Sequence, residues 1–192
     1  LKAVSIPEKH KLKPDVLYFI NGWPVDREDF AFDNDCPIYT DGSAKNVQWP
    51  DIAVASSACF QIDKEGKHRL VVAQLPPSFP ISAVASEFYA FALAADSLPV
   101  EGGVPPIVSD CQAVVQAFSN LERHSDYRSK FAGMWRSPNI ERVPECKKVK
   151  AHLSQQEAEE LGLGEDWFGN DRADYFAKDT LADTWKDGIA YV

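Results

Sequence analysis

The chain has 192 residues, of which 45% are hydrophobic, so global disorder is excluded and one medium domain with an added segment is expected. Its net charge of −9 argues against a protein that binds nucleic acid mainly through a basic surface. The same charge leaves room for an enzyme whose acids are neutralised by bound cations. The apolar runs are too short to cross a bilayer, so we expect no membrane partner.

The four cysteines, at positions 36, 59, 111 and 146, include no Cys-x-x-Cys pair, so neither a zinc motif nor a dithiol motif is present. Buried, reduced thiols are typical of intracellular proteins, and we expect this location, in the cytoplasm or the nucleus. Because the sequence begins at Leu1, we expect it to be a piece of a longer chain.

Residues 1–35 differ in composition from the rest. The charged "EKHKLKPD" is followed by the apolar "VLYFINGWPV" and then by the acidic "DREDFAFDND". We interpret this region as an N-terminal extension or linker that carries one short packed element, and we place a single domain at 36–192.

Three strand candidates with turn-like connections follow. The first, "CPIYTD" (36–41), ends in Asp41, and the Asp-Gly pair at its end is a strong hairpin signal. The second, "IAVASSACFQID" (52–63), and the third, "HRLVVAQL" (68–75), are separated by "KEGK". Strands connected in this way form an antiparallel meander.

The segment "ISAVASEFYAFALAADSL" (81–98) predicts a helix, because its apolar side chains recur at helical spacing. They form one inward stripe of Val84, Phe88, Phe91, Ala95 and Leu98. A short buried strand, "IVSD" (107–110), and a helix, "CQAVVQAFSNL" (111–121), come next.

The C-terminal part continues the alternation of strands and helices. "YRSKFAGMWR" (127–136) predicts a helix, "KKVKAH" (147–152) a strand, and "SQQEAEELG" (154–162) a small helix with a capping box. "DRADYFAKDTLADTW" (171–185) predicts a final helix with Asn170 as its N-cap. Because strands separated by helices pair in parallel, we expect a mixed α/β sheet flanked by helices.

Four acidic residues fall on different elements of this arrangement. Asp41 and Asp110 end the first and fourth strands, Glu87 lies at the edge of its helix's apolar stripe, and Asp174 lies one turn into the last helix. The carboxyl ends of adjacent strands meet at one sheet edge, so Asp41 and Asp110 would stand side by side. Such carboxylates repel each other unless a proton or a cation intervenes, and oxygen ligands favour Mg²⁺ or Mn²⁺.

Each acid also has a simpler structural explanation. Asp41 could be a turn residue, and Asp110 could cap the helix that it precedes. Glu87 could lie on an ordinary helix surface, and Asp174 could be solvated like its neighbour Asp171. For any one acid taken alone, the structural explanation is the default.

Taken in order, "DGS", an early-helix Glu, "SD", "VKAH" and "GNDRADYFAK" resemble the type 1 ribonuclease H family, and most of all the ribonuclease H domains of reverse-transcribing elements. The resemblance covers roughly residues 36–183. No single motif is specific, whereas the ordered set is. It implies an α/β ribonuclease H-like fold, with a mixed five-stranded sheet of three antiparallel strands and then parallel strands, flanked by helices.

The resemblance also implies a catalytic site with two Mg²⁺ ions, for which Mn²⁺ is an alternative. The matching metal ligands are Asp41, Glu87, Asp110 and Asp174. Asp174 is preferred to Asp171 because it follows Ala173 and precedes "YFAK". His152 matches the family's catalytic loop histidine, although a surface histidine is its simpler explanation.

The implied reaction is endonucleolytic, two-metal hydrolysis of the RNA strand of an RNA–DNA hybrid, which leaves a 5′-phosphate. Gly42, Ser43 and Ala44 match the family's contacts to the RNA in the minor groove. Ser82 matches a hydroxyl that binds a DNA phosphate, and it could equally be an N-cap. The expected partners are the hybrid and a covalently linked reverse transcriptase or other polyprotein domains, as in a retrotransposon.

The sequence departs from the family pattern in three places. Val84 and Ala85 stand where the family has an amide and an arginine, and the family's basic helix is absent before His152. The third departure is an insert at 154–169 that would lie beside the metal site. It could gate access or contact substrate, and we favour surface elaboration. We therefore expect hybrid binding to be weaker and to depend on a neighbouring domain.

Two other functions remain open. The chain could be a catalytically silent domain that serves as a structural or nucleic-acid-binding module, or another nuclease of the same superfamily, such as a resolvase or an exonuclease. The complete acid set argues against the silent domain, and "DGS" with "VKAH" favours ribonuclease H over the other nucleases.

Overall fold

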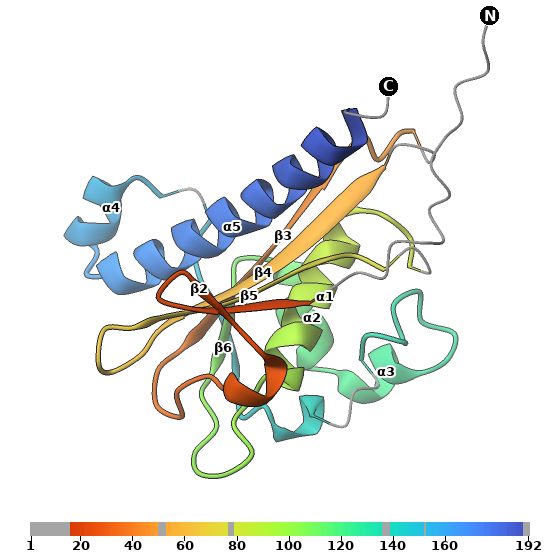
Figure 1. Cartoon of the computed structure of the whole chain (residues 1–192). Coiled ribbons are helices and arrows are strands. Elements are labelled where there is room, and N and C mark those ends of the chain that lie inside the picture. Colours follow the sequence, from red (N-terminus) through yellow and green to blue (C-terminus); the bar gives the residue numbers. More distant parts are fainter. Residues whose placement is uncertain (1–15, 50–52, 77–78, 136–138, 152, 190–192) are drawn as a thin grey trace, which may run out of the picture.

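A seven-stranded sheet lies at the centre of the computed structural model, which describes residues 16–49, 53–76, 79–135, 139–151 and 153–189 (Figure 1). The strands are β1 (Leu17–Ile20), β2 (Trp23–Val25), β3 (Ile38–Lys45), β4 (Val54–Ile62), β5 (His68–Gln74), β6 (Ile107–Ser109) and β7 (Cys146–Lys148). The helices are η2 (Arg27–Asp29), α1 (Ala83–Asp96), α2 (Gln112–Phe118), α3 (Leu121–Ser125), η3 (Ile140–Arg142), α4 (Gln155–Glu160) and α5 (Gly164–Ile189).

The strand order β2-β1-β5-β4-β3-β6-β7 confirms the predicted mixed sheet. β3, β4 and β5 form the antiparallel meander, and β6 and β7 extend the sheet in parallel with β3. All five predicted strands are present as β3 to β7. The sheet is wider than predicted because a β1–β2 hairpin pairs with β5.

Residues 16–35, which we assigned to the N-terminal extension, pack against the rest of the chain. Besides the hairpin, this region places Phe30 and Phe32 in the main hydrophobic core. Its backbone is held to the meander, because Arg69 Nη1 donates a 2.6 Å hydrogen bond to the Ala31 carbonyl. The boundary at residue 36 itself stays a prediction.

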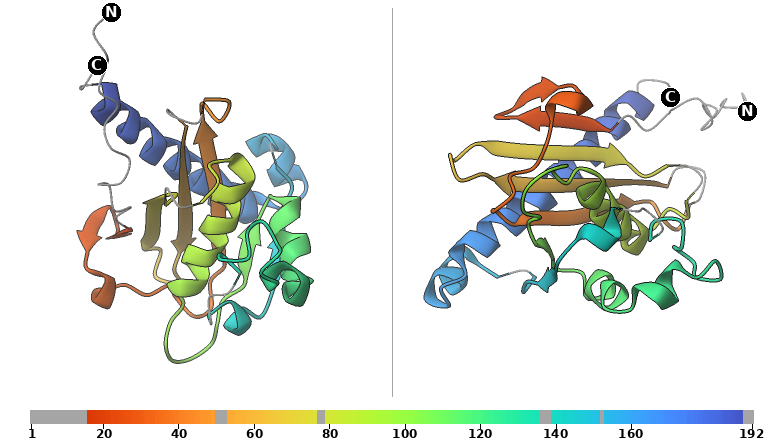
Figure 2. Two further views of the ribbon diagram at one scale, coloured as in Figure 1. Left: turned by 90° about the vertical axis from the view of Figure 1, so that its right-hand side faces the viewer. Right: turned by 90° about the horizontal axis from the view of Figure 1, so that it is seen from below.

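The two faces of the sheet are covered by different helices (Figure 2). On one face, Ile38 of β3 packs in a core with Phe91 of α1 and Val114 of α2. On the other face, Tyr39 packs in a smaller cluster with Ala173 of α5. Neighbouring residues of β3 thus point to opposite faces, as the pleat of a strand requires.

Two glycines allow close approach on either side of β3. A Cβ atom at Gly42 would lie 2.3 Å from the backbone nitrogen of Glu87 in α1, and one at Gly169 of α5 would lie 2.2 Å from the Tyr39 ring. Residues with a side chain would push both helices away. The glycines therefore fix how near α1 and α5 come to the centre of the sheet.

The predicted helix at 127–136 is wrong. A short helix, α3, ends at Ser125, and residues 127–135 form turns. Asp126 Oδ1 accepts a 2.8 Å hydrogen bond from the Arg128 backbone N–H, and such local side-chain bonds compete with helix formation. Phe131 and Trp135 then turn inward against Phe88.

Several predicted details also differ from the structure. β3 runs through the Asp-Gly pair to Lys45, β7 stops at Lys148, and α5 begins at Gly164, so Asn170 is not a helix cap. Val84 is 41% exposed and does not belong to the inward stripe of α1. The other four members of the predicted stripe are buried, and α1 approaches β3 through Ser86, which faces Gly42, and not through Val84.

The predicted free thiols are present, although only Cys59 is fully buried and the other three cysteines are partly exposed. Within the described residues, no helix combines the length and the apolar character that a bilayer span requires.

Candidate active site

The candidate site begins where β6 stops pairing with β3. The two strands pair from Ile38 to Thr40, opposite Ile107 to Ser109, and the next residue on each chain is an acid. Asp41 and Asp110 therefore stand side by side, as expected from parallel pairing. Asp41 does not end β3, whose residues up to Lys45 continue to pair with β4.

Glu87 completes a set of three converging acids. Carboxylate oxygens of Asp41, Glu87 and Asp110 all lie within 4.8 Å of one another. Glu87 can reach this position because Gly42 lets the first turns of α1 lie directly against β3. One strand, one helix and one strand end thus each supply a carboxylate to the same point.

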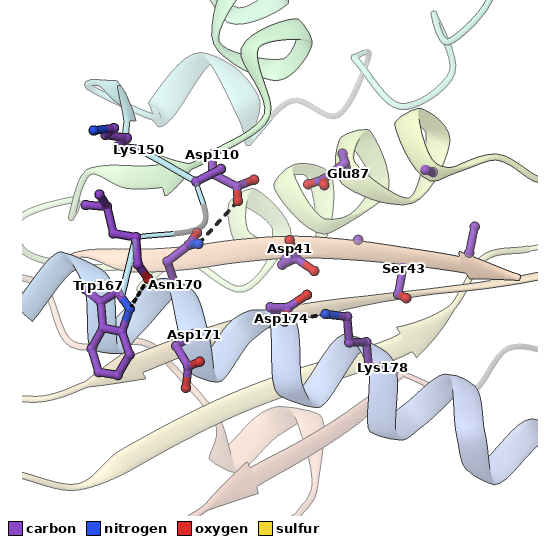
Figure 3. A pocket seen from close by; sticks show the side chains of 15 residues that line it. Asp41, Ser43, Glu87, Asp110, Lys150, Trp167, Asn170, Asp171, Asp174 and Lys178 are labelled. Atoms are coloured by element: carbon purple, nitrogen blue, oxygen red, sulfur yellow. Dashed lines mark hydrogen bonds and ion pairs between the residues drawn. The ribbon is translucent and has the colours of Figure 1, made fainter. Parts of the chain in front are cut away.

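Asp174 enters the same cavity from the opposite side. Figure 3 shows its carboxylate beside Asp41, with α5 forming the wall across from Glu87 and Asp110. The cavity has a volume of about 510 Å³ and is lined by all four acids. Asp174 Oδ2 accepts a 2.7 Å hydrogen bond from Lys178 Nζ.

The clustering strongly disfavours ionisation of two of these acids. Burial raises the pKa of Asp41 to about 8, and the charges of Asp110 and Asp174 add to the shift. Burial likewise raises the pKa of Glu87 well above its usual value, with further contributions from Asp41 and Asp110. A hydrogen bond from the Gly42 backbone N–H opposes both shifts.

The donor set suits a divalent cation. Glu87 Oε2 is buried and has no hydrogen-bond partner, which is costly for a carboxylate oxygen unless a proton or a cation satisfies it. Every converging ligand atom is a carboxylate oxygen, the type that Mg²⁺ and Mn²⁺ prefer. A cation held by Asp41, Glu87 and Asp110 would remove both the repulsion and the unsatisfied oxygen.

Asp110 is further oriented by α5. Asn170 Nδ2 donates a 3.3 Å hydrogen bond to Asp110 Oδ2, and Asn170 Oδ1 is buried without a partner. Lys148 Nζ donates to the Asp110 backbone carbonyl. The sequence suggested a helix cap for Asn170, and its amide is instead used inside the site.

Only some of the other predicted site residues lie at the cavity. Gly42, Ser43 and Ala44 line the cavity. Ser82 caps α1, because its Oγ accepts a 3.1 Å hydrogen bond from the Ala85 backbone N–H. His152 lies outside the described residues.

The simpler explanations for the acids fit the structure poorly. Asp41 lies within β3 and not in a turn, and the N-cap of α2 is Cys111, not Asp110. Glu87 is directed into the cavity, with one oxygen fully buried. Asp174 has 39% of its side chain exposed, in keeping with its simpler explanation as a solvated residue, but it pairs with Lys178.

The insert lies beside the cavity, as predicted from the sequence, and Trp167 from it lines the cavity wall, which plain surface elaboration does not require. α4 has the predicted capping box between Ser154 and Glu157. Beyond it, Trp167 Nε1 donates a 2.9 Å hydrogen bond to the Leu153 carbonyl, and both residues line the cavity. The signal available in the sequence was the position of Trp167, three residues before "NDRAD".

No family model and no curated protein matches this sequence. Solved structures do match. The ribonuclease H domain of prototype foamy virus (PFV) is 18% identical, with a TM-score of 0.52, over 75% of this chain and 92% of that chain. LC9-RNase H1, described as a type 1 RNase H with the type 2 active-site motif, is 11% identical, with a TM-score of 0.55. The match covers 78% of this chain and 73% of that chain.

The native protease-reverse transcriptase of prototype foamy virus is also similar. It is 17% identical, with a TM-score of 0.54, over 75% of this chain but only 20% of that longer chain. At these identities the likeness shows the fold. The chain has a ribonuclease H-like fold, in agreement with the resemblance found in the sequence.

Proposed function

We propose that this protein is a metal-dependent ribonuclease H that cleaves the RNA strand of RNA–DNA hybrids endonucleolytically. The observation that carries the proposal is the convergence of Asp41, Glu87 and Asp110, with Asp174 across the same cavity, around a carboxylate oxygen that lacks a partner. The ribonuclease H-like fold supports the same substrate class.

The four acids would hold two divalent cations, with Mg²⁺ as the first choice and Mn²⁺ as the alternative. Asp41, Glu87 and Asp110 would hold one ion, and Asp41 with Asp174 the other. When bound, the ions supply a water of lowered pKa and neutralise the charge that develops on the leaving 3′ oxygen. The products would be a 5′-phosphate and a 3′-hydroxyl.

The remaining residues would position the substrate. Gly42, Ser43 and Ala44 line the cavity along β3, where small residues let an RNA strand come close enough for contacts to its 2′-hydroxyls. The hydroxyl of Ser82, although it accepts a hydrogen bond as an N-cap, could still donate one to a DNA phosphate. His152 would relay a proton or assist product release.

We also propose that the domain works as part of a longer polyprotein with a reverse transcriptase. The likeness to a protease-reverse transcriptase, of which 20% of the chain is covered, supports this arrangement. The acidic net charge supports it as well, because a linked domain would supply the basic surface that this chain lacks.

A catalytically silent, nucleic-acid-binding domain is the second candidate. Val84, where the family has an amide, is 41% exposed on α1 and offers no polar contact to a base. A structural module that does not cut hybrid would retain the fold despite this loss, which would leave its hybrid binding weak. The cleavage assay below separates the two candidates.

The decisive assay uses labelled RNA–DNA hybrid, RNA duplex and DNA duplex, each with Mg²⁺, Mn²⁺ or a chelator. We expect cleavage of the RNA in the hybrid alone, and only with a divalent cation. Asp110→Asn should lower the rate by more than about a hundredfold, because even partners of metal ligands are worth 10- to 100-fold.

The matched control is Asp35→Asn, which removes an equal charge at an exposed residue paired with Lys64, and its rate should equal that of the wild type. Hybrid binding without cleavage would favour the silent domain. Cleavage of the DNA duplex, or of branched DNA included as a fourth substrate, would favour another nuclease of the superfamily.

A further inference from the structure

Asp174 stands apart from the other three acids of the candidate site. Oxygens of Asp41, Glu87 and Asp110 lie within 4.8 Å of one another, and in the described part of the chain this set does not include Asp174. Asp174 Oδ2 instead accepts a 2.7 Å hydrogen bond from Lys178 Nζ, one turn further along α5. The cavity thus holds three crowded carboxylates beside a fourth that already has a cationic partner.

Lys178 also interacts with the crowded set. Its side chain lines the cavity and points toward Asp174 and Asp41 (Figure 3). Lys178 Nζ bonds Asp174 Oδ2, so the ammonium already holds an oxygen that a cation between Asp41 and Asp174 would use.

This ion pair can be displaced. The side chains of Lys178 and Asp174 are 61% and 39% exposed, and exposed pairs at this helical spacing are weak. A divalent cation carries twice the charge of an ammonium and binds carboxylate oxygens directly. It would compete effectively for Asp174 once a first cation had neutralised Asp41, Glu87 and Asp110.

We propose that Lys178 is an internal counter-cation for Asp174, which gives way when the second of two divalent cations binds. The inference rests on the proposed function, because it treats the four acids as cation ligands. The first ion would occupy Asp41, Glu87 and Asp110 without disturbing Lys178, and the second would require the ammonium to leave Asp174. Two divalent cations balance four carboxylates, so the ammonium is needed only while the second ion is absent.

The proposal is tested by titrating the full chain with Mn²⁺ and measuring free Mn²⁺ by electron paramagnetic resonance, without nucleic acid. The wild type should bind two ions, the second more weakly. Lys178→Met should tighten the second dissociation constant at least about threefold, because it removes a competing charge next to Asp174. The first constant should stay within about twofold of the wild-type value.

Three variants separate displacement from a general effect of charge. Lys178→Arg keeps the cation, and because a guanidinium also bonds carboxylates it should bind the second ion no more tightly than the wild type does. Lys67→Met removes the same charge from another exposed pair, whose Lys67 Nζ to Glu65 Oε2 distance is 2.6 Å on the β4–β5 turn, and should change neither constant. Lys178→Gln, with equal helix propensity to lysine, should repeat the result of Lys178→Met.

The proposal is overturned if Lys178→Met and Lys178→Gln leave the second constant unchanged, or if Lys67→Met tightens it equally. Those results would leave the proposed function intact, because both ions would still bind. Failure of the wild type to bind any Mn²⁺, or wild-type binding by Asp110→Asn, would instead overturn the metal site and the Lys178 inference together.

Discussion

The two walls of the candidate site are built in different ways. The wall formed by β3, α1 and β6 is buried, and its acids are forced together by strand pairing and by the contact between Gly42 and α1. The wall formed by α5 and the insert is partly exposed, and its acid is held by Lys178. Crowding of the acids at the first wall lowers the stability of the fold. The partly exposed side chains of the second wall can rearrange when a ligand binds.

At the first wall, the clustering of acids that function requires lowers the stability of the fold. Repulsion and burial at the first wall destabilise the metal-free protein, because carboxyl groups there lose hydration without gaining enough hydrogen bonds. The surrounding sheet and α1 hold the acids in place regardless. Substitutions that neutralise an acid of the first wall should therefore change stability and activity in opposite directions.

The largest expected effect is that of Glu87→Gln. It should lower hybrid cleavage by more than about a hundredfold and raise the free energy of unfolding in chelator at pH 7.5 by about 1–3 kcal/mol, because a neutral amide replaces a buried acid whose pKa is raised. Single-turnover cleavage and urea denaturation measure the two effects. Glu65→Gln, at an exposed pair, is the control and should change neither. A destabilised Glu87→Gln protein would contradict the account.

Gly42→Ala should damage the same wall through geometry. The added Cβ would lie 2.3 Å from the Glu87 backbone nitrogen, so α1 must move away from β3. We expect a loss of about 2–3 kcal/mol in unfolding free energy, together with loss of cleavage. Gly164→Ala, where a Cβ meets nothing within 4 Å, should be neutral or slightly stabilising. Equal stability of the two variants would argue against the close contact of α1 with β3.

The pH dependence of stability should also distinguish the first wall. The pKa of Asp41 is about 8 in the folded protein against 3.8 in the unfolded chain, so the folded state binds more protons between these values. The unfolding free energy of metal-free protein should therefore fall as pH rises from about 4 to about 8, by about 1 kcal/mol or more.

Thermal unfolding in chelator at several pH values measures this decline. Asp63, whose pKa is lowered, contributes stability above its unfolded pKa and loses it only in more acidic solution, so it does not mask the trend. Mg²⁺ should raise the melting temperature more at pH 8 than at pH 5, and Asp41→Asn should flatten the profile. A metal-free profile that rises across this range would contradict the prediction.

The smallest expected effect belongs to the second wall. Trp167→Phe keeps an aromatic ring but removes the 2.9 Å hydrogen bond to the Leu153 carbonyl, which is worth about 1 kcal/mol. Hydrogen exchange should quicken in α4, while hybrid cleavage stays within about threefold of the wild-type rate. Trp23→Phe, on the exposed edge strand β2, is the control. A loss of cleavage as large as that of Glu87→Gln would mean that the second wall is as rigid as the first.

The first wall was largely predictable from the sequence, and the second was not. Parallel pairing alone places Asp41 next to Asp110, and helical spacing places Glu87 at the edge of a buried stripe. The early start of α5 was missed because Asn170 is a good capping residue, while Glu165 and Asp166 provide acids in the true first turn. Capping signals are local, and only tertiary contacts decide between two of them.

Other misses have the same origin. The apolar spacing at 127–136 favours a helix. Turns form instead, because Asp126 accepts a local hydrogen bond and because Phe131 and Trp135 pack into the main core. The Asp-Gly pair at Asp41 reads as a hairpin, yet Gly42 pairs with Ser57 and β3 continues. Long-range contacts that no short motif records contributed to both outcomes.

A crystal structure with Mn²⁺, analysed by anomalous scattering, tests the central claim most directly. The account predicts an ion at about 2.0–2.3 Å from oxygens of Asp41, Glu87 and Asp110, and a second beside Asp174 with Lys178 displaced. Anomalous density confined to exposed acids such as Asp35, with Asp41, Glu87 and Asp110 bearing no ion, would contradict it.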